Sequence, residues 1–261
     1  MIIAPGPEET MHKLDFPAFQ SDLARGGLNL CQLFALADLA ESMPDLQFAT
    51  DFSHLLLIGN SGADLWTAMP AEYLGRADPI DEYSIDCVER ACAKALSLGE
   101  WQILFPQLPV GGGSAGLPVP LQKLGTLAGW HHPSPLGIGI NATHGLWFAY
   151  RGVVLIQAEV SGTQQSLAAD QIKLTAQSPC LSCETTPCLS HCPAEALALD
   201  KNPDLQSCVS YRVGEASDCA STCLARLACP VGSAFKYTDE QTAYFYNRSL
   251  AAAVRWVDKS D

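Results

Sequence analysis

The sequence predicts an α+β fold with a cysteine-rich, metal-binding insert near its C-terminal end. Helical patterns interspersed with separated strand patterns precede residue 161, and eight of the eleven cysteines lie between Cys180 and Cys229. One more helical pattern follows these cysteines. With 261 residues and 48% apolar composition, the chain is long enough to bury a substantial core. We therefore expect an α+β domain interrupted late in the chain by the insert.

The first part of the chain carries patterns for three helices and a strand. Apolar residues recur at spacings of three and four over residues 27–43 and 80–98, which predicts two amphipathic helices. The short apolar run HLLLIG at 54–59 predicts a buried strand. Proline and glycine break the chain over residues 106–120, so we expect a loop there, and a third helix over 120–129.

The strongest strand pattern is the segment GIGINATHGLWFAYRGVVLIQAEV. Its aromatic and β-branched residues predict two strands joined by a turn at residues 142–145. Residues 161–179 show little periodicity and are expected to connect to the cysteines. After the cysteines, Thr238 followed by Gln241 matches a capping box, which predicts a terminal helix that continues to about residue 257.

Charge and hydropathy disfavour two classes of partner. The chain has 15 basic and 28 acidic residues, and its net charge of -13 would repel nucleic acid. No uncharged apolar run approaches the roughly 18 residues of a membrane span, and the first residues lack the pattern of a signal peptide. We expect a cytoplasmic protein that binds neither nucleic acid nor a membrane.

Eight cysteines fall into two groups. In CLSCETTPCLSHCP, the cysteines at 180, 183, 188 and 192 are separated by two, four and three residues, and a proline follows the last. The second group, at 208, 219, 223 and 229, is spaced more widely and again ends in Cys-Pro. In a cytoplasmic protein such clusters indicate metal rather than disulfides. The remaining cysteines, Cys31, Cys87 and Cys92, lie on apolar faces of predicted helices and are expected to be small buried side chains.

The spacing of the first group is typical of bacterial ferredoxins, in which the fourth thiolate crosses to the other cluster. A cubane has iron corners that face different directions, so a short loop binds three of them and the fourth ligand comes from elsewhere. We therefore predict two [4Fe-4S] clusters with exchanged ligands, one held by Cys180, Cys183, Cys188 and Cys229 and the other by Cys192, Cys208, Cys219 and Cys223. Structural zinc and reactive or structural thiols are the alternatives, and the wider gaps of the second set fit a cluster less well.

Three segments outside the cysteines resemble the cobalamin-processing CblC family: residues 141–155, DPIDEYSIDCVERA at 78–91, and KYTDEQTAYF at 236–245. The cysteine window is instead similar to the ferredoxin module of epoxyqueuosine reductases and reductive dehalogenases. CVSYRVGE at 208–215 carries that similarity, and AGW at 128–130 and the Asn141 turn also resemble the epoxyqueuosine enzyme.

The resemblance implies a division into three parts. Residues 1–175 would form a nitroreductase-like domain that binds cobalamin in its base-off form, with flavin as the less favoured cofactor. Residues 176–235 would form a ferredoxin-like module with two clusters. The helix at 236–261 would pack back on the first domain.

The resemblance also implies a set of cobalamin contacts. The two glycines of GIGIN would bring backbone against the corrin face, two aromatic residues would wall the cofactor, and an arginine would meet an anionic cosubstrate, a corrin side chain or a buried carboxylate. The alternatives are that the glycine segment is an ordinary strand and that the two aromatic residues only pack in the core. The implied cofactor-binding residues are Gly137, Gly139, Asn141, Trp147, Phe148 and Arg151.

Histidines are assigned only a peripheral role. His131 and His132 would lie at the pocket rim, and His144 is a further titratable group nearby. No Asp-x-His-x-x-Gly motif is present to ligate cobalt, so a five-coordinate or water-bound cobalt is expected. The segment GGGSAGLPVP has no acidic residue where an epoxyqueuosine reductase places its general acid, and no residue is assigned a catalytic role.

The predicted function is that of an iron–sulfur-dependent cobalamin reductase, an oxidoreductase that binds cobalamin base-off and removes its upper ligand or reduces the cobalt. Two alternatives stay open: a cobalamin-dependent reductase of a separate organic substrate, and a cobalamin carrier with structural clusters. The expected partners are cobalamin, an electron-donor protein or another low-potential reductant, and a downstream protein that accepts cobalamin.

Overall fold

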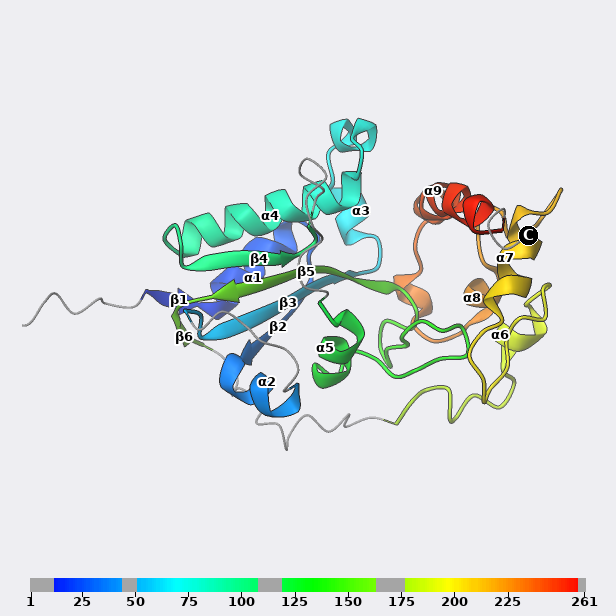
Figure 1. The fold of residues 1–261 in the computed structure, drawn as a ribbon, viewed down its shortest axis with the longest axis horizontal. Coiled ribbons are helices and arrows are strands. Elements are labelled where there is room, and N and C mark those ends of the chain that lie inside the picture. Colours follow the sequence, from blue (N-terminus) through cyan, green and yellow to red (C-terminus); the bar gives the residue numbers. More distant parts are fainter. Residues whose placement is uncertain (1–11, 44–50, 108–118, 163–176, 258–261) are drawn as a thin grey trace, which may run out of the picture. The chain divides into compact units, whose positions relative to one another are not determined.

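The computed structural model describes residues 12–43, 51–107, 119–162 and 177–257, which form a mixed α and β structure (Figure 1). The chain divides into two compact units. We call them the sheet unit, comprising Met1–Asn60, Ala68–Pro120 and Tyr150–Ile172, and the cysteine unit, comprising Ser61–Thr67, Leu121–Ala149 and Lys173–Asp261. No described helix is long and apolar enough to cross a bilayer.

A four-stranded sheet forms the centre of the sheet unit (Figure 1). Its order is β2-β3-β5-β4, where β2 pairs antiparallel with β3 and β4 pairs antiparallel with β5. The bounds are β2 Leu30–Ala35, β3 His54–Ser61, β4 Trp101–Phe105 and β5 Phe148–Ile156. A second, two-stranded sheet pairs β1 Lys13–Asp15 in parallel with β6 Glu159–Ser161.

Two helices of the sheet unit pack against each other, α1 Phe16–Arg25 and α4 Pro79–Ala95. The side chain of Asp15 accepts a hydrogen bond from the amide of Ala18 at 3.1 Å, which satisfies a free donor in the first turn of α1. The shorter helices of the sheet unit are α2 Leu36–Ser42 and the 3₁₀ helix η1 Ala71–Gly75, and α3 Asp64–Ala68 lies almost entirely in the cysteine unit.

Short helices and connecting turns make up most of the cysteine unit. The helices are α5 Leu121–Leu127, α6 Pro187–Ser190, α7 Leu205–Val213, α8 Leu224–Ala228, the 3₁₀ helix η3 Ser233–Phe235 and α9 Asp239–Val257. Helix α6 packs on α8, and α7 packs on α9. The amide of Gln241 donates to Oγ1 of Thr238 at 3.1 Å, so the Thr238 half of the predicted capping box is present, whereas the buried Oε1 of Gln241 has no hydrogen-bond partner among the described residues.

Several predicted elements are confirmed, and two are wrong. The strand at 54–59, the helices at 80–98 and 120–129 and the terminal helix are all present as β3, α4, α5 and α9. The helix expected at 27–43 is instead β2 followed by α2, because residues 30–35 find backbone partners along β3, with Leu30 opposite Gly59.

The segment before β5 forms a turn without a regular strand. Only the isolated bridges His132–Ile140 and Asn141–Gly145 occur there among the described residues, although the expected turn at 142–145 is present. The expected domain boundaries also differ from the division into units, because residues 121–149 and α9 lie in the cysteine unit. Most of the expected loop at 106–120 and connector at 161–179 lies outside the described residues.

Candidate metal centre

Four cysteines, three from residues 180–188 and one from position 229, line a single cavity in the cysteine unit. They are the predicted first set, Cys180, Cys183, Cys188 and Cys229. The remaining walls are almost entirely apolar and include Pro135, Leu136, Ile140, Leu146 and Val231. Ile140 and Leu146 are at most 2% exposed and pack with Cys229 in one buried cluster. The cavity thus combines four thiols with an apolar lining, as a cluster site requires.

Short turns and two helices place these cysteines. The amide of Cys183 donates to the carbonyl of Cys180 at 3.3 Å, which closes a tight turn between them. Cys188 lies within α6, and Cys229 is the residue at which α8 ends. The fourth thiol therefore comes from the end of α8, well after the turns and the helix α6 that carry the first three, as the crossing pattern predicts.

Two glycines allow the turn at 141–145 to lie directly against the chain after Cys229. Gly145 has a φ of +59°, and a Cβ atom there would collide with the carbonyl oxygen of Val231. Gly232 has a φ of +69°, and a Cβ atom there would collide with the backbone of His144. This backbone-to-backbone approach fixes the segment that carries Cys229 and admits no side chain at either position.

The predicted second set also comes together. Cys192 follows α6, Cys208 lies in α7, and Cys219 and Cys223 precede α8. Burial raises the pKa of Cys208, and the neighbouring thiolates of Cys223 and Cys192 raise it further. Burial likewise raises the pKa of Cys219, and the thiolates of Cys223 and Cys192 act in the same direction. All four cysteines of the second set are therefore close neighbours.

The same electrostatic coupling occurs within the first set. Burial is the largest cause of the raised pKa of Cys188, followed by the thiolate charges of Cys229, Cys180 and Cys183. Four thiolates this close repel one another, so their deprotonation is favoured only when a cation joins them. No three or more Cys, His, Asp or Glu side chains among the described residues surround a point suited to a single metal ion. In a cubane, by contrast, each thiolate binds its own iron corner.

The two glycines expected to face a corrin ring are instead packed against the protein itself. A Cβ atom at Gly137, whose φ is +72°, would lie 2.8 Å from Cγ of Pro203. One at Gly139 would lie 2.5 Å from Cγ of His131. Protein side chains therefore occupy the positions that a Cβ atom would take at these two glycines, and contact between their backbone and a corrin ring stays a prediction.

Asn141 and Trp147 are also engaged within the cysteine unit. Oδ1 of Asn141 accepts from the amides of Thr143 and His144 at 2.8 and 2.9 Å, and its Nδ2 donates to the carbonyl of Trp130 at 2.7 Å. This asparagine shapes the turn. Trp147 is 0% exposed, so it is a core residue and offers no wall to a ligand.

The other predicted contacts have protein neighbours too. Phe148 stacks on His131, with ring centroids 6.2 Å apart. Arg151 belongs to the sheet unit, where its Nε donates to Oδ1 of the fully buried Asn60 at 2.7 Å. The partner expected for this arginine was a carboxylate or a ligand, and the structure adds the buried amide oxygen of Asn60 as a hydrogen-bond acceptor.

The histidines of this region are buried or partly buried. His131 is 5% exposed, and burial lowers its pKa, with the charge of His132 acting in the same direction. Burial also lowers the pKa of His144, whose ring meets Phe235 edge-on at 4.5 Å. Both rings are therefore held neutral near pH 7, and His131 is a packing residue rather than part of an exposed rim.

Arg226 is a notable residue that the sequence reasoning missed. It lies on α8, three residues after Cys223 and three before Cys229. Its guanidinium lies 4.4 Å from the ring centroid of Trp147, and its Nη2 donates to the carbonyl of Leu146 at 2.6 Å. A charged residue in the apolar run LARLA between two cysteines was the available signal. Helix α8 lies between a cysteine of each set. Through its contacts with Trp147 and Leu146, Arg226 attaches this helix to the buried core of the cysteine unit.

Comparisons with known proteins found similarity only at a distance. No family model matches the chain, and no curated protein matches it. Among solved structures, epoxyqueuosine reductase from Bacillus subtilis is similar, with a TM-score of 0.47 and 12% sequence identity, over 86% of this chain and 67% of that chain. The likeness is too distant to assign a residue or a reaction.

Proposed function

We propose that this chain is an iron–sulfur oxidoreductase that holds two [4Fe-4S] clusters. One observation carries the proposal: the eight clustered cysteines gather as two sets of four, and each sequence group gives one thiol to the other set. This exchange is the ferredoxin pattern. It is not expected of two zinc sites formed by separate cysteine pairs.

The chain itself would hold, shield and connect the two centres. Thiolates provide the ligands, and Ile140 and Leu146 keep water away from the first set. Helix α6 has Cys188 within it and Cys192 just after it, so one short helix bears a ligand of each set. Helix α8 does the same, because Cys223 precedes it and Cys229 follows it. When bound, the clusters would supply one-electron transfer at low potential.

The acceptor of the electrons is a separate question. The residues expected to hold cobalamin do not fit that group, because Trp147 is fully buried and the space at Gly137 and Gly139 is filled by protein atoms. We therefore assign no step at cobalt. The alternative drawn from the sequence, a cobalamin-dependent reductase of a separate organic substrate, would use the same contacts; we favour its separate organic substrate as the electron acceptor and assign no cofactor beyond the two clusters. Cobalamin processing and cobalamin carriage, which require the contacts directly, have less support.

Anaerobic reconstitution with iron and sulfide tests the cluster proposal. We expect broad visible absorbance that bleaches with dithionite, and iron and sulfide in the amounts that two cubanes require. Cys188→Ala should remove one centre and Cys208→Ala the other. Cys92→Ala is the matched control, since Cys92 is fully buried on α4 and belongs to neither set. Zinc bound in preference to iron, or full iron content in both test variants, would refute the proposal.

Titration of the reconstituted protein with cyanocobalamin tests the acceptor. The favoured interpretation predicts no shift to the base-off spectrum at any protein excess. A base-off shift followed by cob(II)alamin after reduction would restore cobalamin as the acceptor, and Trp147→Leu would then show whether that residue takes part. The same titration with a flavin covers the other cofactor considered for this fold.

A further inference from the structure

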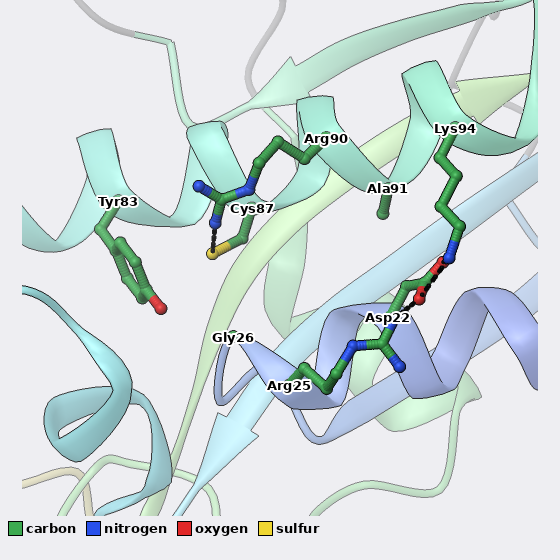
Figure 2. A pocket seen from close by; sticks show the side chains of 8 residues that line it. All are labelled: Asp22, Arg25, Gly26, Tyr83, Cys87, Arg90, Ala91 and Lys94. Carbon is green, nitrogen blue, oxygen red and sulfur yellow. Dashed lines mark hydrogen bonds and ion pairs between the residues drawn. The ribbon is translucent and has the colours of Figure 1, made fainter.

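A second cavity, in the sheet unit and remote in sequence from the cysteine sets, is surrounded by positive charge. It has a volume of about 250 Å³ and lies between α1 and α4 (Figure 2). Arginine and lysine contribute three cationic side chains to its lining, and one carboxylate opposes them. The charged residues are Arg25, Arg90, Lys94 and Asp22. The cavity therefore carries an excess of two positive charges in a chain whose net charge is -13.

The single carboxylate is shared between two of the cations. Asp22 pairs with Arg25 one turn along α1, and Lys94 reaches from α4 to the same carboxylate at 2.7 Å (Figure 2). Arg25 and Lys94 are 67% and 65% exposed, so both side chains are accessible to a ligand. One negative charge cannot neutralise both, and an anion in the cavity would meet two cations held at a common point.

Arg90 has an even weaker partner. Its Nη2 lies 3.1 Å from the sulfur of Cys87, and Figure 2 shows the side chain extending along α4 over that residue. A thiol is a weak hydrogen-bond acceptor, and Arg90 forms no ion pair with any carboxylate in the part of the chain that the structure describes. Its planar group of donors is thus available to an oxyanion.

We propose that this cavity binds a small ligand through a phosphate group. A phosphate monoester carries close to two negative charges at pH 7, which matches the charge excess of the lining. Two guanidinium groups and an ammonium from two helices match its three terminal oxygens, because arginine binds phosphate through paired hydrogen bonds. The cavity volume is below that of a typical drug-sized site, so a small phosphorylated molecule fits better than a dinucleotide.

Calorimetric titration of the complete, reconstituted chain with inorganic phosphate at constant ionic strength tests the proposal. We expect saturable binding of one phosphate per chain, and at least about a tenfold loss of affinity in Arg90→Gln, the effect of removing a hydrogen bond to a charged group. Arg25→Gln should weaken binding in the same direction. Arg76→Gln is the matched control, since Arg76 pairs with Glu82 outside the cavity and its loss changes the net charge equally.

Acetate and thermal unfolding complete the design. Acetate carries one charge and should bind much more weakly than phosphate. Phosphate should raise the unfolding temperature of the wild type but not of Arg90→Gln, a comparison that also detects a folding defect in the variant. The proposal is overturned if phosphate does not saturate, if Arg76→Gln loses as much affinity as Arg90→Gln, or if acetate binds as tightly as phosphate.

Discussion

The sheet unit and the cysteine unit bury very different amounts of apolar side chain along their elements. In the sheet unit, residues 55–58 of β3 are four consecutive apolar residues at 0% exposure, covered on both faces of the strand. In the cysteine unit, neither α6 nor α7 buries a single residue. Apolar burial accounts for the first unit, whereas the segment that carries the cysteines needs another source of stability, and ligation by its thiolates would provide one.

Removing the metal should give the largest difference in stability between the two units. When iron is chelated from the reconstituted protein, we expect amides of α7 to lose nearly all protection from hydrogen exchange, because its packing alone buries too little. Amides of β3 should keep their protection. Mass-spectrometric hydrogen exchange of both segments measures this difference. Equal protection of α7 with and without iron would mean that packing alone holds the cysteine segment.

The reverse experiment weakens the sheet unit and leaves the metal centres intact. Leu57→Ala removes a fully buried side chain from β3, and we expect a loss of about 2–5 kcal/mol in the free energy of unfolding. Iron content should not change. Leu98→Ala is the matched control, because Leu98 is 97% exposed and its replacement should cost no more than about 0.5 kcal/mol. Urea unfolding and iron analysis of the two variants show whether the sheet unit can lose stability while the cysteine unit keeps its iron. A loss of iron in Leu57→Ala would contradict this.

A smaller effect should come from the turn that supports Cys229. Gly145→Ala places a methyl group against the carbonyl of Val231 at a positive φ, so we expect a loss of about 2 kcal/mol or more and weaker iron retention. Gly129→Ala isolates the backbone effect, since Gly129 also has a positive φ, of +66°, but no atom within 4 Å of its added Cβ. If both variants lose the same stability, close backbone approach is not what fixes this turn.

Local chemistry explains which parts of the structure could be predicted. The cysteine sets were predictable because ligand spacing is a short-range pattern, and the cap at Thr238 because its hydrogen bond spans three residues. β2 was mistaken for a helix because its partner, β3, is supplied by residues 19 to 29 positions later. Helix α1 was missed although Asp15 followed by Pro17 is a recognisable start signal.

The predicted cofactor contacts show a different limit of sequence reasoning. Gly137 and Gly139 were correctly singled out as positions that admit no side chain, but the sequence does not show what excludes it. The neighbours are Pro203, far along the chain, and His131, eight residues earlier. A glycine required by a ligand and a glycine required by a protein side chain have the same sequence pattern, and only the fold separates them.

The smallest expected effect concerns pH and His131. Burial lowers the pKa of this histidine in the folded chain, so the unfolded chain binds its proton first as the pH falls below about 6.5. Stability should therefore decline from that pH down toward the lowered folded pKa, by at most about 1.4 kcal/mol per pH unit for one proton. His131→Phe, which keeps a ring against Phe148, should make the decline shallower. Burial also lowers the pKa of His54 and His144, so part of the slope should remain. Urea unfolding at a series of pH values measures both slopes, and identical slopes would mean that His131 titrates alike in the folded and unfolded chain.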